Sequence, residues 1–97
     1  MATFAILASL TEAGARDLNG IMERRSESLR ELERHGIKTL ADYALMGGEY
    51  DFLYIVDAES NEAILREIAR ATENGRLRFR TMPALPLDAF AQLLHRS

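Results

Sequence analysis

The stretch Gly47-Gly48-Glu49-Tyr50-Asp51-Phe52-Leu53-Tyr54-Ile55-Val56-Asp57 decides the fold of this chain. Its two glycines permit a tight turn, including backbone angles that strain other residues. The segment from Phe52 to Val56 is continuously apolar and consists of residues that favour strands. A strand that is apolar on both faces needs cover on both faces. The sequence therefore raises the question of what covers the second face of the sheet.

Length and composition are typical of a small globular protein. The 97 residues predict a single domain over residues 1–97. A domain this short buries only about 60–65% of the surface of its unfolded chain, so association with another chain would help it. The net charge of −3 argues against broad binding to nucleic acid or to anionic membranes. The absence of cysteine excludes disulfides, thiolate nucleophiles and cysteine-based metal sites.

The N-terminal segment does not have the layout of a signal peptide. It carries little positive charge, and its apolar run ends at Thr11 and Glu12. No apolar run approaches the ~20 residues that a membrane span needs. We therefore expect a cytoplasmic protein that has no membrane partner.

Four segments have the pattern of strands. Residues 2–10 are apolar on both faces, which is typical of a central strand. Residues 37–46 and 51–57 flank the glycine turn and predict a β-hairpin. Residues 76–82 alternate strictly, which predicts a half-buried strand. In the second segment, simple alternation predicts that one face carries Ile37, Thr39, Ala41, Tyr43 and Leu45.

Three segments have the pattern of helices. The first runs from Thr11 to about residue 35, and its apolar stripe is interrupted at Arg25, so we expect an irregular start and a firm helix from about residue 21. The second covers residues 61–73, with Ser60 as its N-cap. The third is a short amphipathic helix over residues 87–95, whose apolar side must pack on something.

The element order β-α-β-β-α-β with a C-terminal helix predicts a ferredoxin-like α+β sandwich with a four-stranded antiparallel sheet. Both main helices of this fold cover one face of the sheet and leave the other face open. Since the first and third strands are apolar on both faces, the open face should be covered by a second copy, by the C-terminal helix or by a bound ligand. We favour a homodimer that associates through the sheet, and the tail helix could pack across the partner and strengthen it.

The residues Gly48-Glu49-Tyr50-Asp51 resemble the signature of the GYD domain family. Similarity extends to Ala2-Thr3-Phe4, to Leu10-Thr11 with Gly14, to Gly36 and to the apolar strand that ends at Asp57-Ala58. This resemblance implies a ferredoxin-like fold of the dimeric α+β barrel type. It implies no particular biochemical activity.

Tyr50 and Asp51 are the first candidates for a ligand-binding site. One interpretation places the tyrosine hydroxyl and the carboxylate at the mouth of a pocket, as hydrogen-bonding or acid–base groups. The other makes Asp51 a cap on nearby backbone amides and Tyr50 a packing residue with a solvated hydroxyl.

Tyr43, Tyr54 and Arg25 complete the candidate set. The two tyrosines lie on strands that should pair, so they could line an aromatic pocket, or belong to the core and an interface. Arg25 stands where an apolar residue is expected. It could pair with a carboxylate, reach a ligand, or extend its charged end to solvent from the edge of the stripe.

Other polar residues give weaker signals. The row Arg76, Arg78 and Arg80 indicates an edge strand protected by charge, and without a nucleic-acid signature we expect no nucleic-acid partner. His35 and His95 have no metal ligands at suitable spacing, so no metal site is predicted. No phosphate-binding loop or nucleophile motif is present, and no cofactor is expected.

Two classes of function remain open. The first is a homodimeric ligand-binding or sensing module that holds a small organic ligand in an aromatic pocket between sheet and helices. The alternative is a cofactor-independent enzyme, of the monooxygenase or isomerase type, by analogy of fold alone. Catalysis would require Tyr50, Asp51 or Arg25 to converge on one enclosed cavity.

Overall fold

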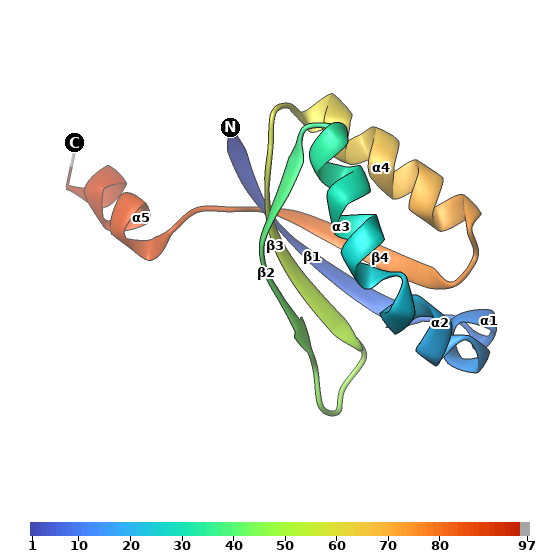
Figure 1. Ribbon diagram of the computed structural model, residues 1–97. Helices are drawn as coiled ribbons and strands as arrows, with labels where there is room; N and C mark the ends of the chain where they lie inside the picture. The colour runs from blue at the N-terminus through green and yellow to red at the C-terminus, as the bar shows by residue number, and fades with distance from the viewer. Residues whose placement is uncertain (96–97) are drawn as a thin grey trace.

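The computed structural model describes residues 1–95 and has a single four-stranded antiparallel sheet (Figure 1). The order of its strands is β2-β3-β1-β4. Their bounds are β1 Ala2–Leu10, β2 Ile37–Ala44, β3 Phe52–Ala58 and β4 Leu77–Ala84. The predicted ferredoxin-like α+β fold is therefore confirmed. The predicted hairpin is also present, since β2 and β3 pair directly.

The helical stretch after β1 begins irregularly, as predicted, but the firm helix expected from about residue 21 is interrupted at Arg24. Three short helices replace one long helix, with bounds α1 Glu12–Arg16, α2 Leu18–Glu23 and α3 Arg25–Arg34. Helix α4 covers Asn61–Glu73, as predicted, and its first turn is capped by Ser60, which accepts from the Ala63 amide at 3.1 Å. Helices α3 and α4 lie on the same face of the sheet (Figure 1).

The hydrophobic core lies between these two helices and the sheet. Alternate residues of β1 and β3 face it, because successive side chains of a strand point to opposite faces. Ile37 and Val56 are the largest fully buried side chains. The core comprises Phe4, Ile6, Ile37, Val56, Ala58, Ala63 and Ile64, with Leu32, Tyr54, Ile68 and Phe79 packed against it.

A bulge in β2 overturns the simple alternation predicted for that strand. The register shifts between Thr39 and Ala41, so Leu40 has no partner in β3. Beyond the bulge, Asp42 is paired with Tyr54, on the helix face. Tyr43 is paired with Leu53, on the opposite face. The prediction that Thr39 and Tyr43 share a face was therefore wrong, because one extra residue reverses the order of the faces.

The face of the sheet away from the helices, here called the open face, has an apolar centre. It carries Ala5, Leu7, Leu53 and Ile55, which are all half-buried, and the more exposed Met82. Its margins are polar, with Lys38 on β2 and Arg78 and Arg80 on β4. No helix within residues 1–95 covers this centre (Figure 1).

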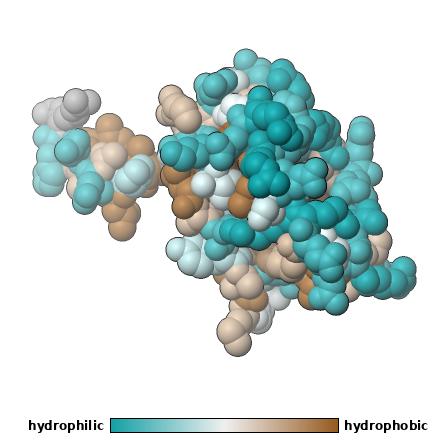
Figure 2. Space-filling view, viewed as in Figure 1, coloured by the Kyte–Doolittle hydropathy of each residue, from teal (hydrophilic) through white to brown (hydrophobic). Residues whose placement is uncertain are grey.

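Helix α5, Leu87–Leu94, projects from the body of the protein (Figure 1). Strand β4 continues through Pro83, which an edge strand accommodates because an amide that points outward needs no partner. The segment Leu85-Pro86 then carries the chain outward. Figure 2 shows hydrophobic atoms on the projecting helix.

Candidate functional site

A groove of about 1070 Å³ runs between the helices and the sheet. Its floor consists of aromatic and aliphatic side chains on the helix face of the sheet, Phe52, Tyr54, Val56 and Phe79. Its walls come from the facing sides of α3 and α4, through Leu29, Leu32, Ile64 and Ile68. This groove is here called the helix–sheet groove.

Arg25 and Asp42 form a two-point ion pair at one end of the groove. The Arg25 Nε donates to Oδ2 at 2.6 Å, and its Nη2 donates to Oδ1 at 2.7 Å. The guanidinium lowers the pKa of Asp42, and the carboxylate raises the pKa of Arg25. The pair joins the first turn of α3 to the edge strand β2. The arginine that interrupts the apolar stripe of the helix therefore binds a carboxylate of the sheet, that of Asp42.

Tyr54 lies beside this ion pair on the floor of the groove. Its cross-strand partner is Asp42. Burial raises the pKa of the Tyr54 phenol, and the nearby Asp42 carboxylate adds to the effect. The hydroxyl therefore stays protonated at physiological pH and can act as a hydrogen-bond donor toward a ligand.

A second polar pair, His35 and Glu67, joins the end of α3 to α4. The His35 Nδ1 lies 2.8 Å from the Glu67 Oε1. Glu67 is only 8% exposed, and it also lines the groove. A buried carboxylate is costly without a partner, and the Arg70 guanidinium, with Nη1 at 3.7 Å from Oε1, compensates part of its charge.

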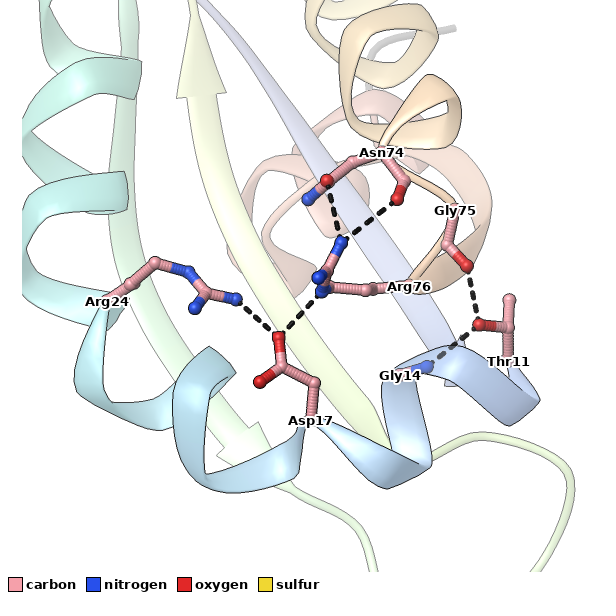
Figure 3. Close-up of polar contacts among 7 residues, drawn as sticks. All are labelled: Thr11, Gly14, Asp17, Arg24, Asn74, Gly75 and Arg76. Carbon is pink, nitrogen blue, oxygen red and sulfur yellow. Dashed lines mark hydrogen bonds and ion pairs between the residues drawn. The ribbon is translucent and has the colours of Figure 1, made fainter.

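A third polar cluster fixes the start of the helical layer to β4 (Figure 3). Asp17 accepts from Arg24 at 2.8 Å and from Arg76 at 2.6 Å, and these two arginines lower the pKa of Asp17. Thr11 donates through its hydroxyl to the Gly75 carbonyl at 2.6 Å and accepts from the Gly14 amide. These groups are mutually satisfied, which indicates a structural role.

Asp51 bonds to the backbone of β1. Its amide donates to the Ala8 carbonyl at 2.8 Å, and its Oδ2 accepts from the Leu10 amide at 2.8 Å. The carboxylate thereby extends the pairing between β1 and β3 beyond the last regular rung. This geometry agrees with the interpretation of Asp51 as a backbone cap.

Tyr50 lies on the side of the open face. Its hydroxyl is next to the Arg80 guanidinium and raises the pKa of that group. The two residues border a shallow hollow that also includes Ser9, Glu49 and Arg78. Arg80 is paired with Leu7, which belongs to the open face.

The structure thus divides the five candidate residues between three places. Arg25 and Tyr54 meet in the helix–sheet groove. Tyr43 borders the groove, but its pairing with Leu53 directs its side chain to the open face. Tyr50 lies near the same face, and Asp51 is bound to the backbone between strands.

Sequence reasoning missed two residues of the groove, Asp42 and Glu67. The interrupted stripe at Arg25 was a signal that a carboxylate partner exists, but nothing local identified it. Glu67 falls within the buried stripe of α4, next to Ile64 and Ile68, and this position was the available signal.

Two features are absent from residues 1–95. No group of three or more potential metal-ligating side chains occurs in this part of the chain. No helix there is long and apolar enough to cross a membrane.

Comparison with known proteins gives two matches. The sequence model of the GYD domain matches residues 4–94. A curated protein of Thermus thermophilus, named glutamine synthetase and cystathionine beta-lyase binding protein, is 37% identical over 95 residues. The aligned region is 96% of this chain and 99% of that protein. No solved structure matches the chain.

Proposed function

We propose that this chain, which belongs to the GYD domain family, is a homodimeric binding protein that associates with a metabolic enzyme. The observation that carries the proposal is the apolar open face of the sheet, which the described chain leaves without cover. Its 37% identical relative is named for binding two enzymes, which supports a role in protein association.

The homodimer follows from the character of the open face. Ile55 and Leu7 lie at its centre and remain half-buried without any helix over them. Stacking two such faces, about 10 Å apart, would remove both apolar centres from water. A two-fold dimer uses the same patch on both chains, so one apolar face is sufficient to build it.

Ile55→Lys tests the dimer. We expect the wild-type chain to have the mass of a dimer in light scattering after gel filtration, over a wide range of dilution. Ile55→Lys places a charge at the centre of the stack and should give a folded monomer. Leu65→Lys, on the exposed side of α4, is the matched control and should leave the mass unchanged. A wild-type monomer at all concentrations would overturn the dimer.

The enzyme partner can be sought directly. Glutamine synthetase and cystathionine beta-lyase from the source organism of this chain are the first two proteins to test, by biolayer interferometry with purified components. We expect saturable binding to at least one of them. Absence of binding to both would remove the support that the relative gives to an enzyme partner.

A second candidate function, binding of a small organic ligand, is favoured by the helix–sheet groove. Its aromatic floor, with the protonated Tyr54 beside a charged pair, suits a ligand with an apolar body and one polar group. The fluorescent probe 1-anilinonaphthalene-8-sulfonate combines an aromatic body with an anionic group. Its fluorescence should rise on addition of the protein, and Tyr54→Leu should change its affinity more than Tyr43→Leu. Equal effects of the two variants would argue against the groove.

The geometry gives less support to a cofactor-independent enzyme. That function would bring Tyr50 or Asp51 to the cavity that Arg25 borders, whereas the lining of the helix–sheet groove among residues 1–95 includes neither. Arg25 itself is engaged by Asp42.

A further inference from the structure

Helix α5 has an apolar side that its own chain does not cover. Leu87 is 81% exposed, Phe90 48% and Leu94 65%. Their spacing of three and four residues places them on one side of the helix. An amphipathic helix with this side in water is unfavourable, and short helices gain most of their stability from packing.

The accessible surface and the radius of gyration of the chain are both larger than those of a compact monomer, as expected if a contact with another chain is missing. Its accessible surface is 7027 Å², whereas a compact monomer of this size exposes about 5,600 Å². Its radius of gyration is 14.6 Å, against about 12.5 Å for a compact domain of this length. The excess surface, roughly 1,400 Å², exceeds the ~800 Å² that each partner buries in a standard interface.

The direction of α5 indicates where the contact lies. Figure 1 shows the helix on the side of the sheet opposite to α3 and α4, which is the side of the open face. It follows β4, which forms one edge of the sheet. A second copy stacked on the open face would lie on this side.

The charges on β4 decide between two ways of stacking the copies. A two-fold axis across the strands would place β4 over the partner's β4, with Arg78 and Arg80 of both chains facing one another. An axis parallel to the strands places β4 over the partner's β2 instead and avoids this repulsion. It also brings Arg80 opposite the partner's Tyr43. Within one sheet, Arg80 is paired with Leu7, Leu7 with Leu53, and Leu53 with Tyr43, so Arg80 and Tyr43 lie at the same position along the strand direction.

We propose that the two copies exchange their C-terminal helices, each α5 packing on the exposed border of the partner's β2 at Leu40. Ala84, the last residue of β4, lies at the same position along the strand direction as Lys38 at the start of β2. Both belong to one row of cross-strand partners that runs through Thr3 and Asp57. Leu40, in the bulge, is 50% exposed and is the nearest exposed apolar side chain on that strand. This exchange rests on the proposed homodimer and adds a second contact to it.

The absence of cysteine makes a cross-linking experiment clean. Two single variants, Leu40→Cys and Leu94→Cys, are mixed, allowed to exchange chains, and treated with a short bis-maleimide. We expect a covalent dimer on a denaturing gel that forms only in the mixture. Gln92→Cys, on the opposite side of α5, is the matched control and should give at least fivefold less product. Equal yields from Gln92→Cys and Leu94→Cys would overturn the proposed contact.

A variant of α5 measures the contribution of the exchange. Phe90→Asp combined with Leu94→Asp should weaken dimerisation at least tenfold, by sedimentation across dilutions, while Gln92→Asp should have less than a twofold effect. An unchanged dimer would refute the exchange but keep the sheet stack. If the doubly substituted chain Leu40→Cys/Leu94→Cys cross-links only within one chain, α5 folds back on its own strand and the exchange is wrong.

Discussion

The central strands β1 and β3 carry apolar side chains on both faces of the sheet, but the two faces differ in what lies over them. On β3, Val56 is 1% exposed beneath the helices, whereas the adjacent Ile55, on the open face, keeps part of its surface in water. Within residues 1–95, the chain thus supplies cover for one face only. Continuous apolar character in a strand therefore predicts cover on both faces. It does not tell whether that cover comes from the same chain or from another.

The largest effect is expected from placing the same charge on each face in turn. Val56→Asp buries an unpaired carboxylate in the core and should destabilise the fold by more than about 4 kcal/mol, enough to unfold a marginal domain. Ile55→Asp should leave a folded chain and act on self-association. Circular dichroism with urea denaturation measures the first effect, and light scattering the second. Comparable unfolding by both variants would remove the distinction between the faces.

A smaller effect confined to the covered side is expected at Gly14. An added Cβ there would lie 1.9 Å from the Arg76 carbonyl oxygen, part of the backbone at the start of β4. The helix or the strand must move, so Gly14→Ala should cost about 1–3 kcal/mol in urea denaturation. Gly20→Ala is the comparison variant, because its added methyl group meets side-chain atoms of Asp17 and Arg24 rather than backbone; it should cost less than Gly14→Ala while it disturbs their ion pair. The dissociation constant of the dimer should not change in either variant. A large change would mean that the helix side and the open face of the sheet are energetically coupled.

The smallest effect is expected from the ion pair that anchors α3 to β2. Arg25 is about half exposed, so Asp42→Asn should cost only about 0.5–1 kcal/mol at neutral pH. The pKa of Asp42 is lowered from 3.8 by Arg25, so the stabilisation is present above pH 3.8 and is lost as the pH falls through the lowered value. The difference in urea midpoint between wild type and variant should therefore close as the pH falls below 3.8. A constant difference over this range would exclude the ion pair as its source.

Much of the fold could be predicted from the sequence because its signals are local. The strand at residues 2–10 and the helix at residues 61–73 have the predicted bounds. In both, the spacing of apolar residues identifies the element. Thr11, the cap of the next helix, marks the end of the strand, and Ser60 and Gly75 mark the two ends of the helix. The irregular start of the first helical stretch was also predicted, but the break at Arg24 falls within the part expected to be a firm helix.

The candidate site was less predictable because its geometry depends on distant pairings. One unpaired residue, Leu40, moves Tyr43 to the open face and Asp42 to the groove. No local pattern distinguishes such a bulge from regular alternation. In the same way, the Asp51 carboxylate binds the amide of Leu10, 41 residues away, and its role appears only when β1 and β3 are aligned.

The central position of β1 has a consequence for the order in which the protein can form. This first strand pairs with β3 on one side and with β4, the last strand, on the other, so Thr3 meets Ala84. Contacts between such distant segments slow folding, because a long loop must close before they stabilise anything. During synthesis, β1 leaves the ribosome before the other three strands and remains without its partner β4 until that strand has also emerged. A nascent chain that ends before residue 77 leaves one edge of β1 without partners, and the sheet is completed only after Ala84, the end of β4, has been made.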